Sequence, residues 1–266
     1  MEDFQWGANP DWLIPDWPAP AHVQAVCTTR AGGQSLPPYD TLNLGDHVGD
    51  APTLVAANRL ILQNSIPAKP VFLSQVHGLE VVQLSHTTPH ATVADACFTK
   101  LDHLACTIMV ADCLPVLFTN NEGTQVAAAH AGWRSLAGLG GQGILEHVFK
   151  SFCHQEHAGL AMPATEIIAW LGPCIGPETF EVGADVRTAF VQNDPVAQAM
   201  FTPCGSNKWM ANLQGLARLR LTALGVTQVF GNDGSPDWCT VSQASRFFSH
   251  RRDGVSGRMA ACIWRG

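Results

Sequence analysis

The stretch that decides the fold is residues 104–130, which read LACTIMVADCLPVLFTNNEGTQVAAAH. Residues 104–110 and 114–119 are short apolar runs without a charged side chain, a pattern typical of buried strands. Residues 124–130 are rich in alanine, which predicts a third strand that packs closely on both faces. Several strands are therefore adjacent along the chain, and this order favours a mixed α+β layered fold over a doubly wound parallel sheet.

The flanking sequence predicts helices and further strands around this centre. One helix should begin at Asp50, because aspartate suits the N-cap and Pro52 fits the first turn, and should run to about residue 64. A second helix is expected over residues 132–152, although its glycines weaken the first half. The remaining helices are predicted at 183–192 and 209–224, and the remaining strands at 22–30, 71–76, 80–84, 167–171, 226–230 and 259–264.

The composition predicts a large buried core. Hydrophobic residues make up 46% of the 266 residues and charged residues only 14%. A chain of this length and apolar content can bury a sizeable core without much solvated helix surface. We see no internal repeat and no linker, so we expect one domain over residues 1–266. Residues 1–20 are rich in Trp and Pro and predict an irregular N-terminal arm across that domain.

Charge and apolar patterning argue against several partners. The formal net charge is −7 and the basic residues are dispersed, so we expect no nucleic acid or anionic membrane as partner. The longest apolar stretch, residues 104–118, is interrupted by Asp112, Cys113 and Pro115, so no membrane span is expected. The acidic N-terminus has no signal-peptide pattern, and nine irregularly spaced cysteines do not form a disulfide framework. We expect a cytoplasmic protein with free thiols, and a monomer, with the oligomeric state left open.

Three chemically capable side chains, His77, Cys113 and His130, lie at the ends of apolar runs next to Gly or Pro. Taken singly, each has an ordinary structural interpretation, because buried cysteines and strand-end histidines are common. Their shared position favours a site, since layered folds place their functional groups where strands open into loops.

Together these side chains suit two kinds of chemistry. Two imidazoles and one thiolate form a soft ligand set for zinc, with a fourth position left for water or substrate. Asp112 and Gln75 could orient the ligating rings. In the other role Cys113 is a nucleophile, and His77 or His130 takes its proton. A non-catalytic metal-binding module is a third interpretation, and the residues alone leave all three open.

Eight short segments between residues 23 and 264 are together highly specific, although none of them is specific alone. Through these segments the chain resembles a family of small bacterial proteins variously called the laccase-domain, multicopper polyphenol oxidoreductase or purine nucleoside phosphorylase family. The segments are TTRAGG (28–33), NLGDHVGD (43–50), QVHG (75–78), ADCLP (111–115), HAGWR (130–134), LGPCIGP (171–177), FEVG (180–183) and FFSHRRDG (247–254).

The resemblance implies a layered α/β/β/α sandwich with mixed sheets, similar to that of the cytotoxic-necrotizing-factor-like cysteine hydrolases. It implies a zinc or copper site at His77, Cys113 and His130. The implied activities are phosphorolysis of adenosine, guanosine, inosine and methylthioadenosine, and deamination of adenosine. Ser135 stands where glycine is commoner in the family, and His250 where tyrosine is common; either difference could alter substrate preference.

Laccase chemistry fits the sequence less well than nucleoside chemistry. Multicopper oxidases hold several copper ions, largely through His-x-His pairs, and the 11 histidines of this chain include no such pair. One His-Cys-His set holds one metal. A zinc-dependent purine nucleoside enzyme is therefore our first hypothesis. The alternatives are a Cys-dependent amidase or hydrolase acting on a cell-wall precursor, and a single-copper polyphenol oxidoreductase.

Phosphorolysis also requires a cationic site for phosphate, for which arginine is the usual planar donor. Arg134 is a candidate because it follows His130 closely, and Arg30 because it precedes a glycine loop whose amides could help. Asn43 is a candidate for a hydrogen bond to the base or ribose. Further arginine candidates are Arg246, Arg251 and Arg252.

Two other cysteines attract attention without joining the site. Cys153 with His154 and His157 has metal-like spacing, but a solvated helix end is the simpler interpretation without a third supporting motif. Cys174 lies in the Gly-Pro loop at 172–177, and we interpret it as a packing residue near the site.

Overall fold

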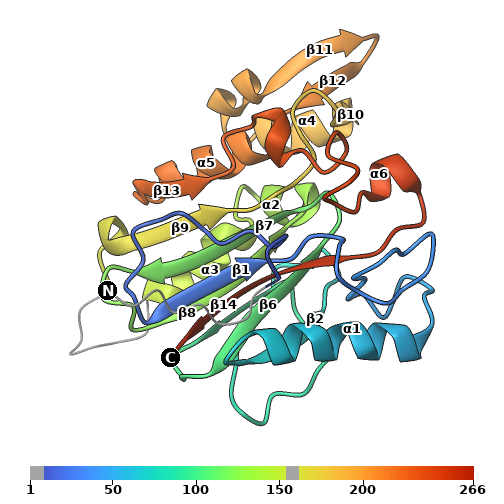
Figure 1. Cartoon of the computed structure of the whole chain (residues 1–266). Helices are drawn as coiled ribbons and strands as arrows, with labels where there is room; N and C mark the ends of the chain where they lie inside the picture. Colours follow the sequence, from blue (N-terminus) through green and yellow to red (C-terminus); the bar gives the residue numbers. More distant parts are fainter. Residues whose placement is uncertain (1–8, 154–161) are drawn as a thin grey trace.

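The computed structural model of this protein describes residues 9–153 and 162–266, arranged in layers (Figure 1). One five-stranded sheet has the order β1-β14-β6-β2-β4. Its antiparallel pairs are β1/β14 and β14/β6, and its parallel pairs are β2/β6 and β2/β4, so the sheet is mixed. The strands are β1 (Val23–Cys27), β14 (Met259–Arg265), β6 (Leu104–Val110), β2 (Lys69–Ser74) and β4 (Thr92–Val93).

A second, six-stranded sheet has the order β13-β9-β7-β8-β5-β3. The antiparallel pairs β7/β8, β7/β9 and β5/β8 are flanked by the parallel pairs β13/β9 and β3/β5. The strands are β13 (Gln228–Gly231), β9 (Ile167–Leu171), β7 (Leu114–Asn120), β8 (Val126–Ala131), β5 (Ala96–Thr99) and β3 (Val81–Gln83).

Side chains alternate between two cores along the central strands, because successive residues of a strand point to opposite faces. Ile108 in β6 and Leu117 in β7 share one apolar cluster between the two sheets. Met109, on the other face of β6, packs with Leu62 of helix α1 (Pro52–Ser65). Phe118, on the other face of β7, packs with helices α3 (Ile144–Cys153) and α5 (Leu213–Ala223). The expected α/β/β/α sandwich with mixed sheets is confirmed.

The helix expected over residues 132–152 is two helices, α2 (Trp133–Ala137) and α3. Gly138 ends α2 with a φ of 64°, and Gly140 and Gly141 also have positive φ. Glycine adopts this left-handed backbone readily, whereas a helix interior cannot contain it. The glycines that weakened the prediction therefore break the helix altogether.

Two other helix starts differ from expectation. Residue 51, not Asp50, is the N-cap of α1, and Asp50 instead accepts hydrogen bonds from the Ser35 hydroxyl and the Asn43 amide. Helix α5 begins at Leu213, because the Asn212 side chain accepts the Gly215 N–H and caps it there. The preceding residues form β12 (Lys208–Ala211), which pairs with β10 (Glu181–Gly183) and β11 (Phe201–Gly205) in a small third sheet.

The remaining elements are short, and the N-terminal arm is only partly described. Helix α4 (Ala184–Val191) and helix α6 (His250–Asp253) lie near the third sheet (Figure 1). Within residues 9–20, Trp12 is buried in the core beside α1, and Leu13 forms an isolated bridge to Cys27. None of the helices in the described ranges combines the length and apolar character that crossing a membrane would require.

Candidate metal centre

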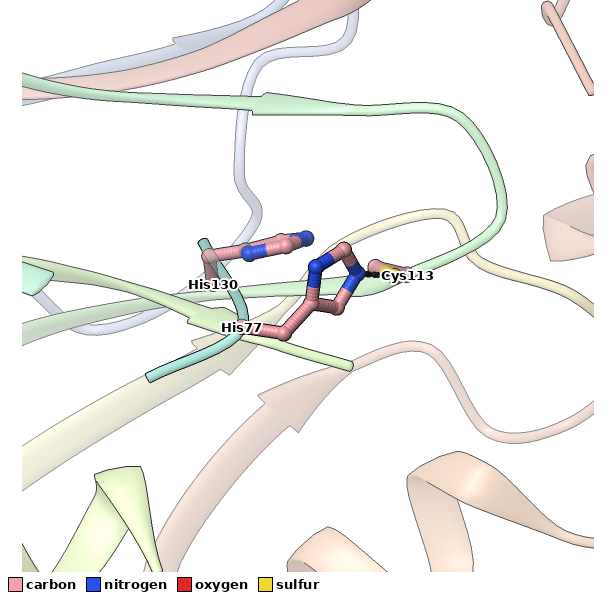
Figure 2. Close-up of side chains that lie close together, drawn as sticks. All are labelled: His77, Cys113 and His130. Carbon is pink, nitrogen blue, oxygen red and sulfur yellow. Dashed lines mark hydrogen bonds between the residues drawn. The ribbon is translucent and has the colours of Figure 1, made fainter. Parts of the chain in front are cut away.

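The fold brings His77, Cys113 and His130 together from three separate segments (Figure 2). His77 follows β2 and Cys113 follows β6, and these parallel neighbours end at the same edge of the first sheet. Both loops then continue into the second sheet, through β3 and β7. His130 in β8 pairs in register with Pro115, so it lies beside the start of β7. The site therefore forms where the chain passes twice from one sheet to the other.

The spacing of two of the three candidate ligand atoms fits a tetrahedral zinc site. Cys113 Sγ lies 3.6 Å from His77 Nε2, and one ligand atom from each residue lies within 4.8 Å of the others. Zinc–sulfur and zinc–nitrogen bonds at tetrahedral angles place their two donor atoms about 3.5 Å apart. The rings of His77 and His130 meet edge to face, with centroids 4.7 Å apart. Two imidazoles and one thiolate also suit copper, so the donor set fits either metal.

The fully buried carboxylate of Asp95 holds two of the three ligands. Its Oδ1 accepts the His130 Nδ1–H at 2.8 Å and the His77 backbone N–H at 2.9 Å. Its Oδ2 accepts the N–H groups of Val76 at 3.0 Å and Gly78 at 2.6 Å. A carboxylate on Nδ1 fixes the tautomer of a histidine, so Nε2 of His130 is left to bind a metal. The same carboxylate stabilises the loop around His77, whose φ is 58°.

Electrostatics favour a thiolate–imidazolium pair at Cys113 and His130 in the metal-free protein. Burial alone would raise the pKa of Cys113, but the charge of His130 and hydrogen bonds from both histidines lower it to about 6. Burial alone would lower the pKa of His130, but the charge of Cys113 and the hydrogen bond to Asp95 raise it to about 9. Burial would also raise the pKa of Asp95, yet hydrogen bonds from His130 and Gly78 hold it below its usual range.

Alkylation should report this pair directly. In the metal-free protein, the rate of Cys113 carboxamidomethylation by iodoacetamide should stay high down to about pH 6 and fall below it, because the thiolate persists down to its lowered pKa. Peptide mass spectrometry of protein labelled at a series of pH values measures this midpoint. His130→Gln removes the neighbouring positive charge and should move the midpoint toward the ordinary thiol value of about 8.5. An unchanged midpoint in that variant would contradict the ion pair.

Gly132 is a point of close approach beneath the ligands. A Cβ at this position would lie 2.7 Å from His77 Cδ2 and 3.1 Å from Cys113 Sγ. Both contacts are closer than van der Waals packing permits, so one ligand would have to move. Gly132→Ala should therefore lower metal affinity by about tenfold or more, a loss typical of disturbed ligand support.

Zinc competition titration against a chromophoric chelator measures the effect of Gly132→Ala. Gly205→Ala is a matched control, because its nearest contact would be Lys208 Cβ at 3.9 Å. The control should bind zinc as the parent chain does. Equal zinc affinity in the two variants would show that the close approach at Gly132 does not constrain the ligands.

Asp112 and Gln75 do not orient the ligating rings in the way the sequence suggested. Gln75 donates to the Met109 carbonyl at 2.7 Å and accepts the Met109 N–H at 2.8 Å, so it clamps the end of β6. Asp112 accepts the Thr240 hydroxyl and the Arg251 N–H, both at 2.6 Å. Its φ of 87° lies in the left-handed region. Asp112 therefore joins the Cys113 loop to the segment that carries α6.

A cavity of about 390 Å³ is lined in part by His77, Cys113 and His130. Part of its wall is apolar, with Ile175 and Phe180 in the lining. Its volume lies within the range of pockets that bind small molecules. Besides the three ligands, the polar and charged lining residues are His47, Gln75, Asp112, His250, Arg251 and Arg258.

Two arginines supply positive charge to this cavity. Arg251 Nη1 donates hydrogen bonds to the carbonyls of Thr179 and Glu181. Arg258 Nη1 donates to the carbonyls of Ser256 and Gly257. Among the described residues, neither guanidinium forms a salt bridge with a carboxylate. Burial lowers the pKa of Arg258, as expected for a cation partly removed from water. The two guanidinium groups therefore add positive charge to a cavity wall that also includes Asp112.

The structure places Arg30 and Asn43 in structural networks outside the cavity lining. Arg30 donates to the carbonyls of Asp40 and Ala244 and pairs with the Asp40 carboxylate at 3.1 Å. The buried amide of Asn43 donates to Asp50, and its Oδ1 accepts the Arg258 N–H at 2.9 Å. Asn43 thus supports a cavity residue. These contacts favour structural roles, and substrate binding by Arg30 or Asn43 stays a prediction.

The other arginine candidates also lie away from the cavity, except Arg251. The guanidinium of Arg134 stacks on the neighbouring Trp133 ring, and that of Arg246 on Phe247. Arg252 donates to the Thr240 carbonyl and pairs with the adjacent aspartate. Cys153 ends α3 and is buried, whereas its suggested companions His154 and His157 lie outside the described residues.

Sequence reasoning does not single out Asp95, His47 or Arg258. A signal existed for Asp95, an isolated acid within the apolar run at 93–98, because a buried carboxylate needs several hydrogen bonds. His47 lies within the segment at 43–50 that carries the family resemblance. Arg258, directly before the last strand, gives no such sign.

Comparisons with known proteins agree with this fold and identify the family. The purine nucleoside phosphorylase YfiH of Escherichia coli is 46% identical over 254 residues, which cover 95% of this chain and 98% of that protein. The same values describe the purine nucleoside phosphorylase PA4543 of Pseudomonas aeruginosa. The crystal structure of a Neisseria meningitidis protein superposes with a TM-score of 0.86 at 44% identity, covering 96% of this chain and 99% of that one. A family model described as multi-copper polyphenol oxidoreductase laccase matches residues 24–266, so the chain belongs to that family.

Proposed function

We propose that this chain is a zinc-dependent purine nucleoside phosphorylase that also deaminates adenosine. Its nucleoside substrates would be adenosine, guanosine, inosine and methylthioadenosine, with inorganic phosphate as the second substrate. Relatives that cover nearly the whole chain at 46% identity are named purine nucleoside phosphorylases, which supports the reaction class.

One observation carries the proposal: the lining of a single cavity includes both the His-Cys-His cluster and two arginines that have no carboxylate partner in the part of the chain that the structure describes. A nucleoside needs an apolar wall for its base, which Ile175 and Phe180 offer. Phosphate needs a cationic site, which Arg251 and Arg258 offer. This arrangement supports the binding of both substrates side by side.

In the proposed enzyme, each group of cavity residues has a separate task. His77, Cys113 and His130 would hold the zinc, which when bound supplies a Lewis acid for oxygen or water in the site. Asp95 keeps the proton of His130 on Nδ1. Arg251 and Arg258 would bind phosphate and orient it toward the ribose C1′, whose bond to the purine breaks.

Phosphate-dependent product formation tests the proposal. Adenosine, inosine, guanosine and methylthioadenosine are each incubated with the metal-loaded protein, with and without phosphate, and chromatography separates free base, ribose 1-phosphate and deaminated nucleoside. We expect base and sugar phosphate only with phosphate present, and inosine from adenosine in either case. Removal of zinc by a chelator should abolish both activities, and added zinc should restore them. Base release that is independent of phosphate would contradict phosphorolysis.

Arg258 is expected to affect phosphate more than nucleoside. Arg258→Gln should raise the KM for phosphate by roughly tenfold to a hundredfold, because a charge-assisted hydrogen bond contributes about 1.5–3 kcal/mol. The KM for nucleoside should change much less. Steady-state kinetics with each substrate varied in turn measures both constants.

Arg134→Gln is the matched control for Arg258→Gln, since Arg134 is exposed, stacks on Trp133 and lies outside the cavity lining. It should leave both constants unchanged. If Arg134→Gln raises the KM for phosphate more than Arg258→Gln does, the phosphate site lies at Arg134, as the sequence suggested, and our assignment to Arg258 is wrong.

A contact chain from Cys113 through His130 to Asp95 supports a second candidate function. In a Cys-dependent amidase or hydrolase, Cys113 would attack a carbonyl of a cell-wall precursor and His130 would protonate the leaving group, with Asp95 orienting the ring. This activity would survive complete removal of metal, whereas the zinc-dependent reaction would not. The family description names multi-copper polyphenol oxidoreductases, whereas one His-Cys-His set would hold a single copper ion. Elemental analysis together with a polyphenol oxidation assay would test a single-copper polyphenol oxidoreductase.

We also propose that residues 1–266 act as one domain, as a monomer in the cytoplasm. The two large sheets share a common apolar core, which supports a single folding unit. Size-exclusion chromatography with light scattering would test the monomer, and a single cooperative unfolding transition would support the single domain.

A further inference from the structure

Two cysteines, Cys174 and Cys239, lie side by side on neighbouring segments and outside the lining of the cavity. They form an isolated parallel bridge, in which Cys174 N–H donates to the Trp238 carbonyl and Thr240 N–H donates to the Cys174 carbonyl. Bridge partners lie about 4.8 Å apart in a sheet. That spacing lies within the Cα separations of about 4.4–6.8 Å that a disulfide accepts.

The sulfur of Cys239 is surrounded by hydrogen-bond donors. It accepts the N–H of Gly176 at 3.3 Å and the N–H and hydroxyl of Ser242 at 3.4 and 3.3 Å, and it lies 3.3 Å from the Thr179 hydroxyl. Burial would raise the pKa of Cys239, but these bonds hold it below its ordinary value. Burial raises the pKa of Cys174. The two thiols are therefore unequal, because the hydrogen bonds around Cys239 favour its thiolate form while burial disfavours that of Cys174.

A small chamber adjoins Cys239. Its volume is about 40 Å³, and its lining includes Gly176, Thr179, Gly234 and Ser242. A bound water requires roughly 10–15 Å³, so the chamber has room for a molecule the size of hydrogen peroxide. It is too small for a nucleoside.

An amide donor without a partner in the described part of the chain lies beside Gly234, one of the residues that line this chamber. Gln214 is 2% exposed, and its Nε2 has no hydrogen-bond partner among the described residues. This nitrogen lies 2.8 Å from the point that a Cβ on the lining residue Gly234 would occupy. Its Oε1 accepts the Cys174 S–H at 3.7 Å. A buried donor without a partner is costly, so this amide marks an incompletely satisfied polar site next to Cys174 and Gly234.

We propose that Cys239 is a peroxide-reactive thiol and that Cys174 resolves its sulfenic acid to a disulfide. The Cys239 thiolate attacks one oxygen of hydrogen peroxide; the S–O bond forms, the O–O bond breaks, and the departing hydroxide takes up a proton as water. The Cys174 sulfur then loses its proton and attacks Cys239 Sγ. The S–S bond forms and the S–O bond breaks, releasing a second water. The two thiols lose two electrons and peroxide gains them.

Asp112 connects this cysteine pair to Cys113, so a structural change on oxidation would be transmitted to the His-Cys-His cluster. The residues that follow the two cysteines, Ile175 and Thr240, both hold Asp112: the Ile175 N–H donates to its carbonyl at 2.9 Å and the Thr240 hydroxyl to its carboxylate at 2.6 Å. A disulfide would draw the two Cβ atoms to about 3.8 Å and shift both contacts beside Cys113. Any loss of phosphorolysis on oxidation rests on the proposed function, whereas formation of the disulfide does not.

Peroxide titration of the zinc-loaded full chain tests the proposal. We expect tryptic mass spectrometry to find a Cys174–Cys239 disulfide that dithiothreitol reverses. In Cys174→Ser, dimedone should trap Cys239 as its sulfenic acid. Cys204 is an exposed thiol in β11 and serves as the internal reference, and Cys239 should react about tenfold faster.

Two further variants separate this site from the metal centre. Ser242→Ala removes one donor to the Cys239 sulfur and should slow oxidation of Cys239 but not of Cys204. Cys113→Ser, which lacks the thiolate of the metal centre, should still form the Cys174–Cys239 disulfide. Oxidation of Cys239 no faster than that of Cys204, or a disulfide that joins either cysteine to another partner, would overturn the proposal.

Discussion

Replacement of Cys113 by serine is expected to remove bound zinc and to lower phosphorolysis by more than about a hundredfold, beyond the loss usual for residues that only support a ligand. Cys113 supplies the one sulfur of the donor set, 3.6 Å from His77 Nε2. A serine hydroxyl is a poor ligand at neutral pH, because zinc binds the deprotonated form of its ligands. Elemental analysis of the purified variant and the phosphate-dependent assay measure the two effects.

The matched control for Cys113→Ser is Cys204→Ser, which changes an exposed thiol outside the cavity lining. It should keep one equivalent of zinc and full activity. If Cys113→Ser binds zinc normally but loses activity, Cys113 acts as a nucleophile, and our assignment as ligand fails. If it keeps both zinc and activity, the site itself is wrong.

Asp95→Asn is expected to weaken zinc binding by about 10–100-fold, because the partner of a ligating histidine sets its tautomer and basicity. The variant should also lower the free energy of unfolding of the metal-free protein by roughly 3 kcal/mol. The Asp95 carboxylate accepts three backbone N–H groups and the His130 Nδ1–H. An amide offers one acceptor oxygen and turns its NH₂ group toward these donors.

Urea unfolding with and without zinc measures both consequences of Asp95→Asn. Asp102→Asn is the control, since Asp102 pairs with Arg265 at the surface and its side chain is 58% exposed. An exposed pair contributes about 0–1 kcal/mol, so the control should unfold almost as the parent chain does. Equal unfolding of the two variants would contradict the central role of the Asp95 carboxylate.

Much of the fold follows from local patterns. The apolar runs around residues 104–130 predict β6, β7 and β8 nearly to the residue, because a buried strand needs consecutive apolar side chains whatever surrounds it. Residues 132–152 show the limit of such patterns. There, glycines with positive φ divide one expected helix into two. Their conformations depend on how the chain turns back onto its own sheet.

The third sheet was not predicted at all. The strands β10, β11 and β12 are three to five residues long, and β12 was expected as the first turn of a helix. Strands this short show little hydrophobic periodicity. They form because each one hydrogen-bonds to a neighbouring strand of the sheet. Pairing of this kind leaves no local signature in the chain.

The sequence by itself determined which side chains could form a metal centre and which runs must be buried, since residue chemistry and hydrophobic spacing are local properties. Only the tertiary structure decided that His77 and Cys113 lie in two crossings between sheets and so meet His130. It also decided that Asp95 supports the ligands, and that Arg258 reaches the cavity where Arg134 does not. Distances across the fold depend on strand register and sheet order, which no single segment encodes.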